Sequence, residues 1–200
     1  MLGTENIKAC LPSNGEENRP GEQGMQKIKI NRDVKVHSYP FKEIFQGFEN
    51  CEAVRETFGT ESDKILDELR VELHSRKGYM GVSETTGNLI VSVHYLKTGD
   101  DRSIYLDVIH ELVHVKQFRE GKDLFDPNYE YVDRPTEVEA YSHSVMEARR
   151  LGMTEAEIME YLRMDWISET DAQKLARRVG VEPKGEPKTI ERPTVRRPMK

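Results

Sequence analysis

Three side chains with the spacing of a metal site stand together in the middle of the chain: His110, Glu111 and His114. Residues four apart lie one above the other on a helix face, so both imidazoles can reach one cation if this segment is helical. Zinc in hydrolytic sites takes three protein ligands and keeps a position for water, whose pKa falls to about 7 on binding. The spacing therefore predicts that His110 and His114 bind one Zn²⁺ per chain and that Glu111 accepts a proton from the water.

A third ligand must come from another segment, and a helix predicted over 136–151 offers Glu137, Glu139 and His143. The expected core-facing stripe of this helix consists of Ala140, Tyr141, Ser144, Val145 and Ala148. Glu137 extends this stripe by one turn, whereas Glu139 and His143 lie together on another side. We therefore expect Glu137 to be the third ligand, with Glu139 and His143 as alternatives. Thr136 and Glu139 also have the spacing of a capping box, which gives Glu139 a structural role.

The sequence around the motif predicts a helix that carries both histidines and a β-hairpin that precedes this helix. Residues 104–118 carry apolar side chains on most sides, as expected of a buried central helix that ends at Gly121. Potential N-caps precede this helix: Asp100, Asp101 and Ser103. Tyr79–Val82 and Leu89–Tyr95 flank the turn-rich segment Thr85–Asn88, which predicts a β-hairpin.

The remaining segments predict short strands first and helices later. Lys27–Ile30 and Val34–Val36 alternate like half-buried strands, and a helical stretch begins at Phe41. Asp63–His74 has apolar residues at helical spacing. Three further helices are predicted after the motif, over 136–151, 154–163 and 168–179. The expected fold class is α+β, with a small mixed β-sheet packed on the helix of the motif and a helical C-terminal half.

The length of 200 residues favours a single domain with flanking tails. Residues 1–24 are rich in Gly, Pro, Asn and Glu, which predicts a disordered leader. Residues 181–200 combine prolines with alternating charges, which predicts an extended tail. The folded domain is expected over 25–180.

Composition narrows the range of partners. The net charge of −6 offers no basic surface for nucleic acid, and no apolar stretch has the length of about 18 residues that a membrane span requires. The two cysteines, Cys10 and Cys51, suggest neither a disulfide framework nor a thiolate zinc site. We expect a cytoplasmic protein that binds neither nucleic acid nor membranes. Its oligomeric state does not follow from the sequence.

On a helix that follows a predicted strand, His110-Glu111-x-x-His114 resembles the motif of the HExxH zincin metallopeptidases. The resemblance covers about residues 78–150. The glycine and third histidine that follow the motif in metzincins are absent from Val115–Glu120. Glu137, followed by Ala140, is instead similar to the ligand helix of gluzincins, which makes the chain similar to a minimal gluzincin-like catalytic domain.

This resemblance implies a zinc-dependent endopeptidase that hydrolyses peptide or protein substrates. In zincins, a strand beside the active-site helix binds the substrate by adding an extended peptide to its edge, and Leu89–Tyr95 is the strand expected to do so here. Glu111 would act as the general base for a zinc-bound water. The alternative is a zinc-binding regulatory or interaction module without turnover, which a fourth protein ligand would favour.

The sequence indicates a catalytic or ligand-orienting role less strongly for other residues near the motif. A peptidase of this type needs a donor that polarises the substrate carbonyl, and Tyr129, Tyr131 and Tyr141 are available. An ordinary core or surface position explains each of these tyrosines more simply. Asp107 precedes His110 by one helical turn and can orient a ligand or face water.

Overall fold

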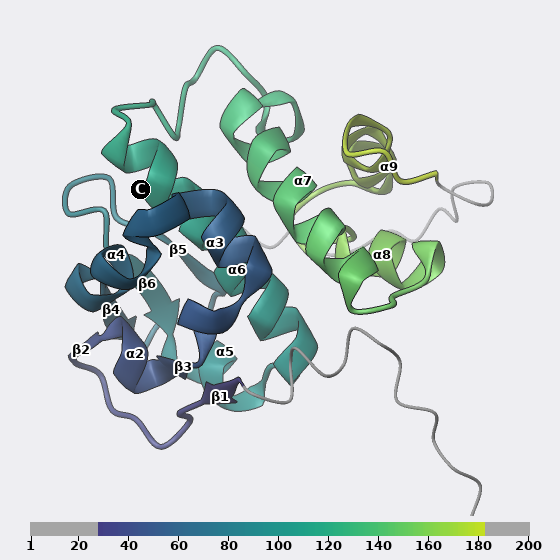
Figure 1. Cartoon of the computed structure of the whole chain (residues 1–200). Coiled ribbons are helices and arrows are strands. Elements are labelled where there is room, and N and C mark those ends of the chain that lie inside the picture. The colour runs from purple at the N-terminus through teal and green to yellow at the C-terminus, as the bar shows by residue number, and fades with distance from the viewer. Residues whose placement is uncertain (1–27, 183–200) are drawn as a thin grey trace, which may run out of the picture.

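The computed structural model describes residues 28–182, and its fold is α+β as predicted. A small sheet and the helices α2–α4 form the N-terminal half, while α7, α8 and α9 form the C-terminal half, and the long helix α6 lies between them (Figure 1). The predicted leader over 1–24 and all but the first two residues of the predicted tail lie outside the described residues.

The main sheet has four strands in the order β2-β4-β6-β5. These strands are β2 Ser38–Pro40, β4 Arg70–His74, β5 Met80–Val82 and β6 Leu89–Ser92. β4 pairs parallel to β6 and antiparallel to β2, and β5 pairs antiparallel to β6, so the sheet is mixed. A second, two-stranded sheet joins β1 Lys29–Ile30 to β3 Phe45–Gln46. The strand predicted over Val34–Val36 is wrong, because the chain is irregular there and pairs only from Ser38.

The single helix predicted over Asp63–His74 is wrong in its second half. Helix α4 ends at Glu68, and the chain continues as strand β4. The sequence around Val71 carries both periods, since its apolar residues alternate with charged ones while also continuing the helical spacing. Pairing with β2 and β6 buries Val71 and Leu73 on one side of the strand, and this long-range pairing decides in favour of the strand.

The predicted hairpin is present as β5 and β6, although its second strand is shorter than expected. β6 ends at Ser92, whose hydroxyl caps the short helix α5 Val93–Thr98 by accepting a hydrogen bond from Tyr95 N. β6 also lies between β4 and β5, so its edges are already paired. The expectation that Leu89–Tyr95 offers an edge to an added peptide is therefore wrong, and β5 is the edge strand next to it.

Helix α6, Asp101–Arg119, carries the motif and is buried along most of its length. Asp100 caps it, because its carboxylate accepts a hydrogen bond of 3.0 Å from Ser103 N. The hydrophobic core fills the space between the sheet, α6 and helix α3, Glu52–Phe58. The apolar residues around the motif thus hold α6 in the interior, as the sequence predicted.

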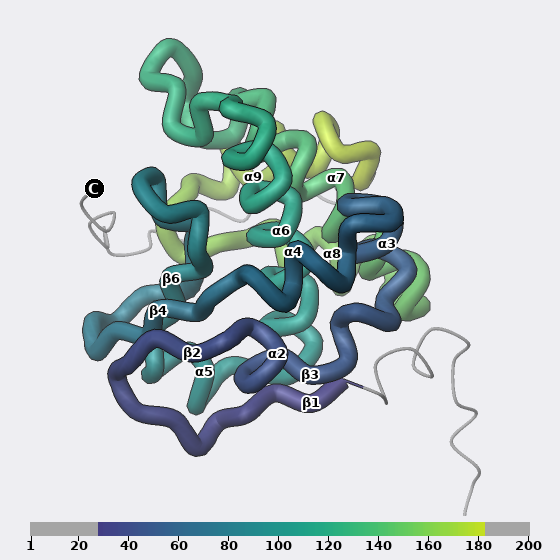
Figure 2. Tube along the Cα trace, turned by 60° about the vertical axis from the view of Figure 1, so that its left-hand side comes forward, coloured from purple at the N-terminus to yellow at the C-terminus, as the bar shows by residue number. Residues whose placement is uncertain are grey.

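The three helices predicted after the motif are all present. They are α7 Pro135–Arg150, α8 Glu155–Tyr161 and α9 Glu169–Arg178. Thr154 and Glu157 form a capping box at the start of α8, and Ser168 caps α9. Figure 2 shows the N-terminal strands at one end of the molecule and α9 towards the other.

The remaining elements are short, and none of the described helices has the length and apolar character needed to cross a membrane. They are helices α2 Phe41–Ile44 and α4 Ser62–Glu68 and the 3₁₀ turns η1 Phe48–Asn50, η2 Gly59–Glu61 and η3 Tyr131–Asp133.

Candidate metal centre

Helices α6 and α7 bring His110, His114 and Glu137 together in a buried group that can hold a metal ion. The Nε2 atoms of His110 and His114 are 2.9 Å apart, and Glu137 Oε2 lies 3.4 Å from the first and 3.5 Å from the second. Two ligand atoms at about 2.05 Å from a zinc ion lie about 3.3 Å apart at the tetrahedral angle. The three atoms therefore have nearly the separation that one tetrahedral zinc ion requires.

Close packing of α7 against α6 is what brings Glu137 to the histidines. Ala140 is fully buried, and Ser144 Oγ donates a hydrogen bond of 3.2 Å to Leu106 O of α6. Small side chains at this contact let the two helix backbones approach each other. Ala140 and Ser144 of the expected core-facing stripe do face α6, and they permit this close approach.

The donor atoms of the group are oriented for a cation. Glu137 Oε2 is buried and forms no hydrogen bond within the described residues. Buried carboxylate oxygens are normally satisfied by a donor, so this oxygen lacks a partner of the kind that a metal ion supplies. Its other oxygen, Oε1, lies 3.6 Å from the guanidinium of buried Arg134.

Gln117 fixes the ring of His114. Its Oε1 lies 2.7 Å from His114 Nδ1, and its amide nitrogen donates to Thr136 O and to Glu139 Oε2 at 3.0 and 2.9 Å. Because the Gln117 amide nitrogen is the donor in its other two contacts, its oxygen accepts a hydrogen bond from Nδ1–H of His114. Nε2 is then the ring nitrogen that can bind a metal.

Glu139 takes neither of the two roles that the sequence suggested for it, third metal ligand or capping residue. Glu139 Oε2 accepts from Gln117 and, at 2.9 Å, from Lys122, so it lies outside the metal group. The predicted capping box with Thr136 is wrong, because α7 starts at Pro135 with Arg134 as N-cap and no side-chain cap. His143 is half-buried and is also outside the group.

His110 is held by packing. Its ring lies 4.1 Å from the ring of Tyr141, and its Nδ1 has no hydrogen-bond partner among the described residues. Asp107 does not orient it, because the Asp107 carboxylate accepts hydrogen bonds from the hydroxyls of Tyr95 and Tyr161.

The electrostatics of the group reflect burial and mutual attraction. Burial raises the pKa of Glu111 to about 8 and lowers that of His110 to about 4. Burial also lowers the pKa of His114, but Glu137 and Glu111 outweigh it and hold the value at about 9. For Glu137, burial raises the pKa, yet the two imidazoles outweigh it and hold it well below its ordinary value. Glu137 is thus kept as an anion beside the two rings.

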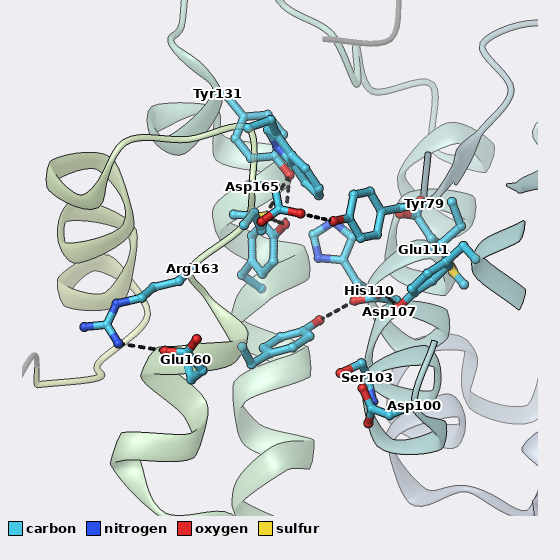
Figure 3. Close-up of a pocket in the computed structure, with 16 residues that line it drawn as sticks. Tyr79, Asp100, Ser103, Asp107, His110, Glu111, Tyr131, Glu160, Arg163 and Asp165 are labelled. Carbon is cyan, nitrogen blue, oxygen red and sulfur yellow. Dashed lines mark hydrogen bonds and ion pairs between the residues drawn. The ribbon is translucent and has the colours of Figure 1, made fainter. Parts of the chain in front are cut away.

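A pocket of about 310 Å³ opens beside the group, with His110 and Glu111 in its wall (Figure 3). Tyr131 and Tyr141 also line it, with their hydroxyl oxygens 2.8 Å apart. Tyr129, the third tyrosine suggested by the sequence, is 45% exposed and does not line the pocket. Glu111 is buried and forms no hydrogen bond within residues 28–182, so its carboxylate is available to a molecule in the pocket.

Sequence reasoning missed two parts of this site. Gln117 has no motif of its own, although its place one turn after His114 is a signal for an orienting residue. The segment between α8 and α9, which brings Asp165 and Trp166 to the pocket, gave no signal, because its position depends on how the C-terminal helices pack.

Comparison with protein-family models, with curated proteins and with solved structures found no match to this chain.

Proposed function

We propose that this chain is a zinc-dependent metallopeptidase, similar to a minimal gluzincin-like zincin, with His110, His114 and Glu137 as metal ligands and Glu111 as general base. The observation that carries the proposal is the approach of the three ligand atoms to 2.9–3.5 Å of one another at the wall of a pocket that also contains Glu111. Two imidazoles and one carboxylate suit zinc better than the hard cations, which prefer oxygen ligands.

A zinc ion held by these residues would polarise the substrate carbonyl and make water more acidic. Glu111 takes a proton from the attacking water, whose oxygen forms the new bond to the carbonyl carbon. The C–N bond then breaks, and Glu111 returns the proton to the leaving amine. The buried carboxylate of Glu111 supports this role, because among residues 28–182 no hydrogen-bond donor competes for it.

The open edge of strand β5 supports the proposal that the substrate is an extended peptide. Tyr79 O accepts a hydrogen bond from Ser92 N of β6, and the alternation of an antiparallel pair then directs the backbone groups of Met80 and Val82 towards the open edge. Met80 also lines the pocket. A peptide added along this edge by strand addition would lie beside the pocket that Met80 and Glu111 line.

The alternative, a zinc module without turnover, requires a ligand set closed by the protein. Within residues 28–182, the group of possible ligands consists of three side chains, and this favours the peptidase.

Elemental analysis of the purified full chain tests the metal centre, alone and as His110→Ala, Glu137→Ala and His143→Ala. We expect about one zinc per chain in the wild type and in His143→Ala, the matched control on α7, and loss of zinc in the other two variants. Absence of zinc from every form after metal supplementation would exclude the peptidase.

Activity against a mixture of unstructured peptides then tests the base. Glu111→Gln should retain zinc and lose about 10²–10⁴-fold in kcat/KM, because it keeps the shape of the side chain without its proton acceptor. Full activity of zinc-loaded Glu111→Gln would contradict the assigned role.

A further inference from the structure

The pocket beside the metal centre is markedly acidic. Its acidic lining residues are Asp100, Asp107, Glu111, Glu160 and Asp165. Among its described lining residues, Arg163 is the one Lys or Arg side chain, and two carboxylates, Glu160 at 2.9 Å and Glu169 at 3.0 Å, neutralise it. The pocket therefore carries a net negative charge.

The acidic groups nearest the motif form no ion pairs that cancel this charge. Asp107 accepts two tyrosine hydroxyls, Asp100 accepts a backbone N–H, and neither they nor Glu111 form an ion pair with a Lys or Arg in the described part of the chain. A zinc ion would add two positive charges, and Glu137 would offset one of them. Asp100 and Asp107 then still favour a cation in the pocket.

Aromatic rings form the rest of the wall. Successive ring centroids are 5.1 Å apart from Tyr95 to Tyr79, 4.8 Å from Tyr79 to Trp166 and 6.5 Å from Trp166 to Tyr131. The path continues through Tyr141, whose ring lies against His110. Aromatic faces attract cations and cover the methylene stem of a long basic side chain.

The segment between α8 and α9 closes the pocket on the side opposite α6. Tyr79 donates a hydrogen bond of 2.6 Å to Asp165 Oδ2, which joins the sheet edge to this segment (Figure 3). The pocket volume of about 310 Å³ lies at the low end of ligand pockets, which start at about 300 Å³. It suits one extended side chain entering beside Glu111.

We infer that this pocket is a subsite for a basic side chain, lysine or arginine, adjacent to the peptide bond that is cleaved. The inference rests on the proposed function for the position of the bond, and on the acidic and aromatic wall for the choice of side chain. The ammonium or guanidinium group lies among the carboxylates and tyrosine rings, and its stem packs along the aromatic wall.

Binding can be measured without catalysis, because Trp166 is the only tryptophan of the chain and lines the pocket. Its fluorescence is titrated with N-acetyl-lysine N-methylamide and with the norleucine analogue, which has the same stem without the amine. We expect the lysine compound to bind about tenfold more tightly, as one charge-assisted contact with cation–π support implies. Equal affinities, or no saturable binding of the lysine compound, would overturn the inference.

Two variants test the acidic wall. Asp107→Asn and Asp165→Asn should each weaken lysine-amide binding about fivefold or more and leave norleucine-amide binding unchanged. Asp63→Asn, an exposed aspartate outside the pocket, is the matched control and should bind like the wild type. Unchanged lysine binding in both pocket variants would contradict the assignment, and thermal unfolding of each variant verifies that it is folded.

Cleavage of a peptide library by the zinc-loaded protein separates the two proposals. Cleavage enriched next to Lys or Arg supports both. Cleavage without this enrichment, together with equal affinities for the two amides, overturns the subsite and leaves the peptidase. Selective binding of the lysine amide without any cleavage overturns the peptidase and supports the pocket as a site for basic groups.

Discussion

Gln117 is a single residue that connects the two helices of the candidate metal centre. One amide orients His114 through its oxygen and contacts Thr136 and Glu139 of α7 through its nitrogen. Residues that orient a metal ligand in this way typically affect metal affinity by about 10–100-fold.

We therefore expect Gln117→Leu to weaken zinc binding about 10–100-fold, because His114 loses the acceptor that fixes its ring and tautomer. Competition with a chromophoric chelator measures the zinc Kd. Gln173→Leu, which replaces a glutamine of α9 far from the ligands in sequence, is the control and should keep wild-type affinity. A wild-type Kd in Gln117→Leu would mean that packing alone orients His114.

Ionisation of the Asp107 side chain should make the free energy of unfolding depend on pH. Burial raises its pKa to about 6, although hydrogen bonds from Tyr95 and Tyr161 oppose the shift. Because the folded pKa lies above the unfolded value of about 3.9, the protonated form favours folding, and this contribution is lost as pH rises through about 6.

The expected outcome is that Asp107→Asn and the wild type have similar stability at pH 4. Above pH 6, the variant should be more stable by up to about 3 kcal/mol, the equivalent of about two pKa units. Urea unfolding of the metal-free protein at a series of pH values measures the difference. A constant difference across pH 4–7 would show that Asp107 does not titrate in this range.

The β5–β6 hairpin packs closely against helix α6 at Gly87. A Cβ atom added at Gly87 would lie 2.4 Å from the Phe118 ring of α6, and its φ of +70° favours glycine. The β5–β6 turn and the C-terminal end of α6 are thus fitted to each other at this point. This contact places the sheet edge relative to the histidines.

Gly87→Ala should therefore destabilise the protein by about 1–3 kcal/mol more than Gly121→Ala, as measured by urea unfolding. Gly121 has a similar φ of +76° but open space around it, so its substitution reports backbone strain without the clash. Equal losses in the two variants would indicate that Phe118 moves aside at little cost.

For the whole molecule, the candidate metal centre lies between α6 and α7, and its residues His114 and Glu137 are more than twenty positions apart in the chain. An ion held by His110, His114 and Glu137 would bind only the folded state, in which the two helices are together. Binding of this kind adds to the free energy of unfolding, by about 2.7 kcal/mol when free ligand is at 100 times its Kd.

Zinc should consequently raise the Tm of the wild type in a concentration-dependent way, and a chelator should reverse the increase. His114→Ala should lose the zinc-dependent part of the Tm, whereas His143→Ala should keep it. Differential scanning calorimetry with and without zinc measures the effect. A zinc-independent Tm in the wild type would contradict metal binding at this centre.

Features that depend on neighbours along the chain could be predicted from the sequence. The HExxH spacing placed His110 and His114 on one face, since a helix repeats every 3.6 residues whatever surrounds it. The same reasoning located the hairpin and the C-terminal helices. The stripe that begins at Ala140 also identified the side of α7 that carries Glu137. The predicted zinc and catalytic roles remain proposals.

Features that depend on contacts between distant segments could not be predicted from the sequence and follow from the packing of the folded chain. Val71 belongs to a strand because β2 and β6 pair with it, although its local pattern also fits a helix. Glu139 lies outside the metal group because Gln117 and Lys122 bind it. The proposed basic-residue subsite depends on the contacts of Trp166 and Asp165 with Tyr79, the residue before β5. Long-range packing sets these contacts, and no local period of the sequence encodes them.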